Sequence, residues 1–511
     1  MAPTPPTRPG TRTKFLRNHP RPTKIVQMDT AVDFVTDIND TFWYAVIALL
    51  IGSGLYYTIR SRFIQIRLLP DMLRSIVEKP ERQPNGEPGL SAFRAFSVSA
   101  ASRVGTGNVA GVAIAISLGG PGAVFWMWAM ALVGAATAFL ESTLAQLYKV
   151  RDEDGSFRGG PAYYMQYGLR KRWMGMIFAV IITITYGFVF NAVQTNSIVD
   201  AVSSSVGEKT MALQVIVGLA VALIVGAVIF GGIRRISGVS QIVVPVLAFV
   251  YLVIGIIVVV LNIGEVPTMF RLIVENAFGL EEVIGGGFGA AFMNGIRRGL
   301  FSNEAGMGSA PNAGAAAAVS HPVKQGLVQS LGVYFDTLLV CSITAFIILL
   351  SEPEFGSGLE GAALTQNALA LQLGDWTVHF LAVLIFFLAF TSVIGNYYYS
   401  ESNMEFLTGS RRILPYLRSA VVLCVFLGAI GSLPLVWALA DLAMGIMATV
   451  NLIALIPLSG IAYALFHHYS AQRKQGRDPV FRAGDVPGLR GIQVWNDDDV
   501  TPVESRSSDA R

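Results

Sequence analysis

Long apolar runs without Lys, Arg, Asp or Glu dominate the chain and alternate with short polar segments. The runs cover residues 41–58, 104–140, 173–199, 210–233, 236–264, 376–400, 419–440 and 442–472. A helix needs about 20 apolar residues to cross the hydrocarbon core of a bilayer, so each run is long enough for one membrane helix, and the longest for two. The pattern predicts an all-α polytopic membrane protein.

Eleven transmembrane helices are expected once long runs are divided and single polar interruptions are allowed. They are predicted near residues 41–59, 93–118, 121–148, 173–199, 211–232, 238–262, 284–302, 326–350, 376–400, 414–431 and 435–466.

Composition supports a lipid environment. Of 511 residues, 53% are hydrophobic and 14% are charged, whereas soluble domains have roughly 25% charged residues. A net charge of +3 is too small to indicate binding to nucleic acid. Cys341 and Cys424 lie inside apolar segments and provide no disulfide framework. The lipid bilayer is the expected surrounding.

Basic residues concentrate in alternate connections between the expected helices. The connections rich in Lys and Arg are 60–82, 149–172, 234–235, 411–412 and 473–477, and the intervening connections have almost no basic residues. By the positive-inside rule, the rich set is cytoplasmic in a multi-pass protein of the plasma or inner membrane. The C-terminus is then inside and the N-terminus outside.

The first residues do not fit this orientation. Residues 1–24 are basic and Pro-rich, which an outside terminus disfavours. They lack periodicity and predict a partly disordered tail, or a reading frame that extends upstream of a true start at Met28.

Two glycine clusters interrupt expected helices. Gly105, Thr106, Gly107 and Asn108 place poor helix formers in a row at mid-span, and a second cluster covers 285–289. Glycine in a membrane helix usually marks close helix packing. These clusters, however, fall at the start of two sets of five helices, the second and the seventh span, which points to the binding site of a secondary transporter.

A repeat of five helices has an odd number of spans, so the two halves must be inverted relative to each other. The predicted domains are a tail over 1–40, an extra helix and loop over 41–92, repeats over 93–264 and 265–468, and a cytoplasmic tail over 469–511.

The first cluster also matches the dinucleotide-binding pattern G-x-G-x-x-A at Gly105, Gly107 and Ala110. That motif must follow a strand and precede an acidic residue by about 20 positions. The next acidic residue is Glu141, and another membrane span intervenes. The context therefore favours a broken helix. Its freed N–H groups suit a carboxylate and its freed carbonyls suit a cation, so the break suits a zwitterion.

Several blocks resemble the alanine or glycine:cation symporter family. They are SRVGTGNVAGVAIAISLGGPGAVFWMW (102–128), ESTLAQLYK (141–149), GGPAYYMQ (159–166), NAVQTNS (191–197), NGIRRGLFSNEAGMGSAPNAGAAA (294–317) and HPVKQGLVQSLGVYFDT (321–337). The resemblance covers about Asp33 to His468. It implies the LeuT-type fold of five plus five inverted repeats with one extra N-terminal helix, and uptake of a small neutral amino acid with Na⁺, in some members with H⁺.

The resemblance also implies a sodium site. It places backbone carbonyls at Ala101 and Val104 and hydroxyl ligands at Thr391 and Ser392, with Leu388 adding its carbonyl. The residues themselves leave an alternative open, because Thr and Ser in a membrane helix often bond to the carbonyl four residues earlier. Five neutral oxygens suit an ion that must be released again.

Substrate contacts are expected at the two breaks and on the fourth span. Phe190 and Gln194 share a helix face, with Asn191 nearby, although packing hydrogen bonds explain Asn191 equally well. Phe190 and Phe288 are expected to close over a small side chain. The predicted set is Gly105, Thr106, Gly107, Asn108, Phe190, Asn191, Gln194, Gly286, Gly287 and Phe288.

Buried charges are further candidates. Arg103 and Glu304 could form an ion pair at an inner gate, or a structural pair between fixed helices. Asp336 could serve a second cation or carry a proton. Arg297 and Arg298 are interpreted as the cytoplasmic end of a helix, because such residues snorkel easily.

The sequence thus predicts a sodium-coupled symporter for alanine or glycine that works by alternating access. It contains no paired acid–base or nucleophile constellation, so no enzyme and no cofactor are expected. The alternatives are a LeuT-type symporter for another small solute, such as a different amino acid or a nucleobase, and, less favoured, a channel.

Overall fold

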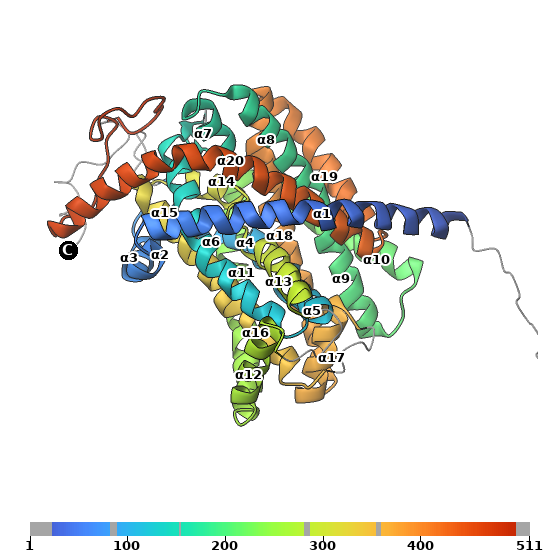
Figure 1. Cartoon of the computed structure of the whole chain (residues 1–511). Helices are drawn as coiled ribbons and strands as arrows, with labels where there is room; N and C mark the ends of the chain where they lie inside the picture. The colour runs from blue at the N-terminus through green and yellow to red at the C-terminus, as the bar shows by residue number, and fades with distance from the viewer. Residues whose placement is uncertain (1–22, 82–88, 153–154, 281–286, 354–358, 497–511) are drawn as a thin grey trace, which may run out of the picture.

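The computed structural model describes residues 23–81, 89–152, 155–280, 287–353 and 359–496. Helices form nearly all of this part of the chain (Figure 1). The first half contains α1 (Thr23–Arg60), α2 (Ile64–Arg67), α3 (Leu69–Ile76), α4 (Ala92–Arg103), η1 (Gly107–Gly111), α5 (Val112–Gly119), α6 (Gly122–Leu147), β1 (Val150–Arg151), β2 (Phe157–Arg158), α7 (Pro161–Tyr167), α8 (Arg172–Ile184), η2 (Thr185–Val189), α9 (Phe190–Val206), α10 (Met211–Ile229) and α11 (Gly232–Leu261).

The second half is built the same way. It contains α12 (Val266–Ala277), α13 (Gly287–Asn303), α14 (Ala310–Ala315), α15 (Pro322–Val333), η3 (Tyr334–Cys341), α16 (Ser342–Leu349), α17 (Gly361–Leu373), α18 (Trp376–Thr408), η4 (Arg411–Ile413), α19 (Leu414–Gly428) and α20 (Leu433–Lys474). Strands β1 and β2 pair antiparallel, with Val150 opposite Arg158.

Eight helical segments in the described residues are long and apolar enough to cross a membrane. The predicted all-α polytopic class is confirmed. The count of eleven stays a prediction, because the interrupted helices and the 15-residue α19 are too short to qualify by length alone.

The first interruption lies where the sequence predicts it. Helix α4 ends at Arg103, Val104 leaves helical geometry with φ −80° and ψ 85°, and η1 begins at Gly107. A backbone that unwinds inside a membrane needs protein partners for its freed polar groups. This interruption is therefore a candidate binding site.

The predicted position of the second interruption is wrong. Gly285 and Gly286 lie outside the described residues, and α13 runs without a break from Gly287 to Asn303. The chain unwinds instead between Glu304 and Ser309, before α14 begins. Glu304, Gly306 and Gly308 have φ values of 58°, 92° and 80°, in the left-handed region that ends a helix.

The two interrupted helices lie against each other in opposite directions. The half before the first interruption, α4, packs against α14, and the half after it, α5, packs against α13. This is the arrangement that an inverted repeat produces around a central site. Figure 1 shows α4, α6 and α13 near the centre of the bundle.

The basic loops gather at one end of the molecule, here called the basic end and defined by Arg60, Arg158, Arg235, Arg411 and Arg473. Figure 1 shows α3, α7 and the end of α20 at this end, with α12 and α17 on the opposite side. Ion pairs join separate loops here, as between Arg473 and Asp71 at 2.6 Å. This clustering agrees with the predicted topology.

Helix α1 starts earlier than the sequence predicts. It begins at Thr23, although the tail was expected to reach residue 40. The segment just before its apolar run is held by neighbours, since Asn39 Nδ2 donates to the Ala438 carbonyl at 2.9 Å and Arg297 Nη2 donates to the Asn39 carbonyl at 3.2 Å. The part of the predicted tail that directly precedes the apolar run is therefore packed against the bundle.

The segment after α20 folds back onto the basic end. Trp495 is buried, and its Nε1 donates to the Gln146 carbonyl at 3.1 Å. Lys149 Nζ lies 4.4 Å from the centre of the Trp495 ring. Phe481, also buried, donates its backbone N–H to the Ser320 carbonyl at 2.9 Å. Part of the predicted tail is therefore integral to the fold.

Replacing Trp495 by alanine is expected to lower the midpoint of thermal unfolding of the purified protein. Loss of a large buried aromatic side chain costs about 3–5 kcal/mol. Trp173→Ala is the matched control, because the Trp173 side chain is 58% exposed. Equal midpoints for the two variants would show that the segment contributes no stability.

Candidate functional site

Two side chains, Asn108 of η1 itself and Gln194 of α9, hold the backbone of the first interruption. The Gly105 N–H donates to Asn108 Oδ1 at 2.9 Å, and the Thr106 N–H donates to Gln194 Oε1 at 3.1 Å. Both amides are buried. The freed N–H groups that a bilayer could not satisfy thus have partners, and four of the predicted substrate residues lie together.

The predicted sodium ligands also meet. Ser392 Oγ on α18 lies 2.9 Å from the Ala101 carbonyl oxygen on α4, to which it donates. The same hydroxyl lies 3.1 Å from the Leu388 carbonyl oxygen, and Thr391 Oγ1 donates to that oxygen at 2.8 Å. All these groups are buried. The bonds to Leu388 are ordinary bonds within a helix, whereas the bond to Ala101 connects two helices.

Gly105 explains why the two helices approach so closely. A methyl group on Gly105 would overlap the Ser392 hydroxyl and crowd Gln194 Oε1. Val104, whose carbonyl is a predicted ligand, precedes Gly105 on the same unwound turn. The glycine therefore lets the Ala101 carbonyl of α4 lie next to the Ser392 hydroxyl of α18.

A second polar cluster surrounds Asp336. Asn108 Nδ2 donates to Asp336 Oδ1 at 2.6 Å, and Ser302 Oγ donates to Asp336 Oδ2 at 2.6 Å. Thr337 Oγ1 also donates to Asp336 Oδ2, at 2.9 Å. All four side chains are fully buried, and no ion pair among the described residues includes Asp336. A buried carboxylate held by neutral donors is a plausible partner for a cation.

The predicted ion pair between Arg103 and Glu304 is not formed. Glu304 accepts from Ser102 Oγ and from Ser309 Oγ, both at 2.7 Å. Arg103 Nη1 donates instead to the Gln329 carbonyl at 3.3 Å. The unwound turn places the Glu304 carboxylate among hydroxyl groups, so it supports the second interruption rather than an inner gate in this conformation.

An aromatic layer covers the first interruption on the side away from the basic end. The Phe190 ring lies 4.8 Å from the Phe301 ring, which lies 4.8 Å from the Trp437 ring. A methyl group on Gly107 would press against Phe301. The space between the interruption and these rings is therefore narrow.

Phe288 does not take part in this layer. Its side chain is 47% exposed and packs against Trp126 and Phe292 at the start of α13. The expected closure by Phe190 and Phe288 is therefore wrong, and Phe301 takes the place of Phe288. The cause is the misplaced second interruption, which put the wrong part of α13 beside the site.

Arg297 and Arg298 likewise do not lie at the end of a helix, since α13 continues to Asn303. The Arg298 guanidinium forms an ion pair with Asp441 near the start of α20 and lies 4.7 Å from the Trp437 ring. Arg297 lies 3.3 Å from Asp40, which directly precedes the apolar run of α1. Both therefore sit on the side of the aromatic layer opposite to the basic end.

Asn191 is used in packing. Its Nδ2 donates to the Gly187 carbonyl, and its Oδ1 accepts from Asn396 Nδ2, each at 3.0 Å. These bonds fix α9 against α18. Of the two interpretations of Asn191, the structure favours the structural one.

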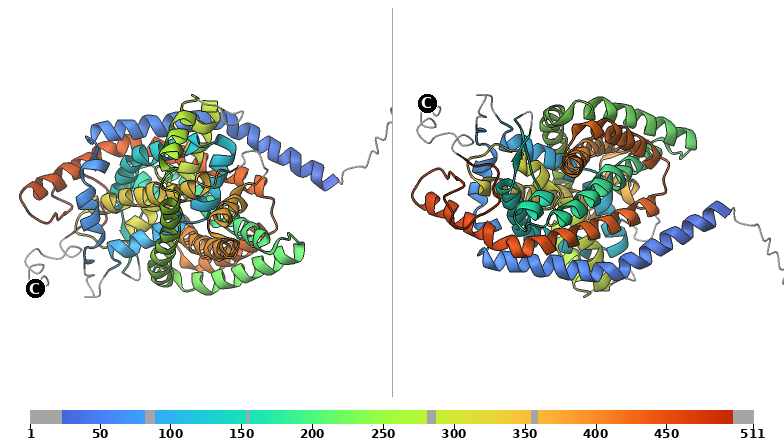
Figure 2. Two further views of the ribbon diagram at one scale, coloured as in Figure 1. Left: turned by 90° about the horizontal axis from the view of Figure 1, so that it is seen from below. Right: turned by 90° about the horizontal axis from the view of Figure 1, so that it is seen from above.

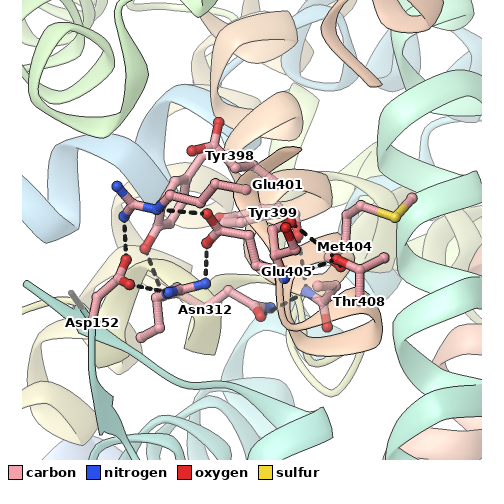
Figure 3. Close-up of polar contacts among 12 residues, drawn as sticks. Asp152, Asn312, Tyr398, Tyr399, Glu401, Met404, Glu405 and Thr408 are labelled. Carbon is pink, nitrogen blue, oxygen red and sulfur yellow. Dashed lines mark hydrogen bonds and ion pairs between the residues drawn. The ribbon is translucent and has the colours of Figure 1, made fainter. Parts of the chain in front are cut away.

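A cavity of about 390 Å³ opens at the basic end, below the interruptions. Residues from α4, α11 and α18 line it, among them Arg94, Ser237, Tyr398 and Glu401, together with Ala316, which directly follows α14. Arg158 forms ion pairs with both Asp152 and Glu405 on the cavity wall. Figure 3 shows Asp152 and Glu405 in this ionic network. The network ties the hairpin of β1 and β2 to the end of α18.

Asn312 lies between this cavity and the second interruption, since its carbonyl accepts from Oη of the lining residue Tyr398 at 3.5 Å. Its Nδ2 donates to the Gly308 and Ser309 carbonyls at 3.0 and 2.8 Å. Its Oδ1 accepts from Asn403 Nδ2 on α18 at 2.9 Å (Figure 3). The unwound turn is therefore anchored to the helix that carries Thr391 and Ser392.

Comparison with known proteins agrees with this architecture. Residues 28–483 match the model of the sodium:alanine symporter family. The chain belongs to this family. The match spans both interrupted helices and the segment that contains Phe481.

Relatives in the family are similar along nearly their whole length. The chain is 51% identical to the amino-acid carrier protein AlsT of Bacillus subtilis over 90% of this chain and 97% of the relative. It is 48% identical to the probable sodium/glutamine symporter GlnT of the same organism, over 89% and 94%. Among solved structures, MhsT in complex with L-phenylalanine aligns with 77% of this chain and 91% of its own, at 14% identity and a TM-score of 0.49.

Sequence reasoning missed Ser302 and Phe301, which flank the second interruption. They directly precede the segment Asn303–Ser309, whose Gly306 and Gly308 repeat the spacing of Gly105 and Gly107. That repeated G-x-G spacing was the available signal for placing the interruption correctly.

Proposed function

We propose that this protein is a symporter that couples entry of a small neutral amino acid, alanine or glycine, to the entry of Na⁺. The observation that carries the proposal is the contact of Ser392 Oγ on α18 with the Ala101 carbonyl in the last turn of α4, directly before the interruption, at 2.9 Å. Family membership supports the same coupling ion. The basic end faces the cytoplasm in this proposal, and no covalent chemistry or cofactor is required.

Sodium binds between α4 and α18 in the proposed mechanism. Its ligands are the carbonyls of Ala101, Val104 and Leu388 and the hydroxyls of Thr391 and Ser392. The oxygens of Ala101, Leu388, Thr391 and Ser392 lie within hydrogen-bond distance of one another in pairs, which suits a small cation that replaces their mutual bonds. Neutral ligands allow release when the helices separate.

The substrate binds at the first interruption, bordered by Gly105, Thr106, Gly107 and Asn108 on one side. Phe190 and Gln194 face these residues from α9. The close approach of Phe301 to Gly107 favours a small side chain. Alternating access then requires two alternating openings of the substrate site. On one side the aromatic layer opens, and on the other side the cavity at the basic end connects to the substrate site.

Asp336 supplies the second coupling element. Its carboxylate touches Asn108, which also holds the Gly105 N–H. A second Na⁺ or a proton bound at Asp336 would therefore act through Asn108 on the backbone that binds substrate. Arg103 and Glu304, each buried beside an interruption, are proposed to change partners during the cycle.

Replacing Gln194 by alanine is expected to raise the alanine concentration for half-maximal uptake by roughly tenfold. The change leaves the buried Thr106 N–H without its acceptor and so loosens the substrate-binding turn. Gln366→Ala is the control, because Gln366 is equally buried but donates to carbonyls of α9 and α18 away from the interruption. An unchanged alanine concentration for half-maximal uptake in Gln194→Ala would show that Gln194 does not contribute to substrate binding.

Glutamine is a second candidate substrate, because a relative with 48% identity is named a probable sodium/glutamine symporter. Uptake of labelled alanine into proteoliposomes, in competition with unlabelled glycine, serine or glutamine, tests the choice. Displacement by glycine and serine at similar concentrations, with weak displacement by glutamine, supports the small substrate. Strong displacement by glutamine alone would overturn it.

A further inference from the structure

Helices α10 and α19 leave an apolar groove of about 540 Å³ between them. The walls are formed by large side chains, most of them half exposed or more, namely Leu219, Leu223, Phe230, Leu423 and Phe426. Small residues, Ala222 and Gly226, also line the groove. The groove is therefore a preformed space for an apolar chain.

The groove lies on a surface that faces lipid. Helix α10 is one of the eight candidate membrane spans. Exposed leucine and phenylalanine side chains on such a helix contact acyl chains rather than water. The volume lies inside the roughly 300–1,000 Å³ range of small-molecule sites. It is large enough to hold part of one lipid molecule in a fixed position.

Two arginines stand at the end of the groove nearest the basic end. Arg418 Cζ lies 5.6 Å from the centre of the Phe230 ring, which is part of the wall. Arg235 Nη1 donates to the carbonyl of Ala227, another lining residue, at 2.8 Å. Arg235 is exposed. The apolar groove thus ends at two guanidinium groups.

This combination of charge and shape fits an amphipathic anion. Guanidinium groups bind phosphate oxygens through paired hydrogen bonds. Basic pockets between membrane helices on the cytoplasmic side bind lipid head groups. Arg418 also donates to Tyr397 Oη at 2.8 Å and lies 3.5 Å from Glu401, so Arg235 provides most of the uncompensated charge.

We propose that this groove binds an anionic phospholipid, with an acyl chain between α10 and α19 and the phosphate at Arg235 and Arg418. The apolar walls distinguish a lipid from free phosphate, which would gain nothing from them. The charge at one end distinguishes an anionic lipid from a zwitterionic one.

The bound lipid would touch the cavity at the basic end indirectly. Glu401, the partner of Arg418, lines that cavity, as do Ile233 and Arg234 beside Arg235. The head group would hold the ends of α11 and α18 in position there. This consequence for substrate release rests on the proposed transport function, whereas lipid binding itself does not.

Lipid binding is measured on the purified full-length protein in detergent by native mass spectrometry. Phosphatidylglycerol and phosphatidylcholine with identical acyl chains are titrated separately, and inorganic phosphate is added as a competitor. We expect the anionic lipid to bind at least fivefold more tightly and free phosphate to compete poorly. Arg235→Gln should reduce this preference roughly fivefold.

A second variant tests whether the groove holds the acyl chain, without changing any charged residue. A methyl group on Gly226 would meet Val422 Cγ2 at 3.6 Å, an ordinary contact, so Gly226→Leu should fold and fill the groove. It should weaken binding of both lipids. Arg62→Gln is the control, since Arg62 follows α1, and the blue α1 and the green α10 lie on opposite sides of the molecule (Figure 2).

Equal affinity for the two lipids, or an unchanged preference in Arg235→Gln, would overturn the proposal. Efficient competition by inorganic phosphate would assign the arginines to a free anion instead. Loss of a dimer in Gly226→Leu, with lipid binding unchanged, would show that a second copy of the chain covers the groove.

Discussion

Replacing Ser392 by alanine is expected to raise the Na⁺ concentration for half-maximal uptake by at least about tenfold, and Thr391→Ala should act in the same direction. A hydrogen-bonding ligand to a charged group contributes about 1.5–3 kcal/mol, and 1.4 kcal/mol corresponds to a factor of ten. Ser392 Oγ is the group that reaches the Ala101 carbonyl across the helix interface. The measurement is initial uptake of labelled alanine at varied Na⁺ concentration.

Ser400→Ala provides the matched control. Ser400 lies on the same helix, is fully buried, and donates to the Asn396 carbonyl of its own helix at 3.2 Å. Its removal should leave the Na⁺ dependence unchanged. Full Na⁺ dependence in both Thr391→Ala and Ser392→Ala would mean that the ion binds elsewhere.

Asp336→Asn is expected to reduce coupled uptake by a factor of at least one hundred. A unit charge 4 Å from a cation contributes about 4 kcal/mol at an effective dielectric constant of 20. The amide keeps the shape of the side chain, and its oxygen still accepts from Asn108 Nδ2. Its NH2 group donates to the Ser302 and Thr337 hydroxyls, which can rotate to accept. The loss should therefore appear in transport, with little change in thermal stability.

The same variant separates the two possible cations at Asp336. If a second Na⁺ binds there, the Hill coefficient for Na⁺ should fall in Asp336→Asn. If a proton binds, the variant should lose the dependence of uptake on external pH. Asp200→Asn is the control, because Asp200 pairs with Lys209 at 3.7 Å, away from the interruptions. Wild-type uptake in Asp336→Asn would exclude both roles.

The first interruption was predictable from local sequence. Four poor helix formers in a row, Gly105 to Asn108, oppose helix formation wherever they occur in a membrane span. Thr391 and Ser392 were predicted as sodium ligands because the resemblance to the symporter family assigns that role to two adjacent hydroxyls. Their meeting with Ala101 depends on packing, which Gly105 permits by having no side chain.

The second interruption was misplaced because glycine density was used as the criterion. The cluster at 285–289 has more glycines than the segment at 304–309. The deciding feature is instead the positive φ of Gly306 and Gly308, together with buried polar groups that hold the loop. The Gly306 N–H donates to Glu141 Oε1 at 3.3 Å and its carbonyl accepts from Asn451 Nδ2 at 2.9 Å. Partners from distant helices are not visible in a local window.

The π-helical turns could not be predicted either. Asn108 lies in η1 and Asp336 lies in η3, and η2 directly precedes Phe190. Such wide turns are rare and concentrate at functional sites. They form where neighbouring side chains compensate for the altered backbone bonds, so their positions follow from the assembled fold.

Uptake of labelled alanine into proteoliposomes tests the central claim most directly. The account predicts accumulation under an inward Na⁺ gradient, increased more than about tenfold by an inside-negative potential, since a charge moving through 100 mV contributes about 2.3 kcal/mol. It also predicts no accumulation when the gradient is made with K⁺, Li⁺ or choline. Equal uptake under those matched gradients would contradict sodium coupling.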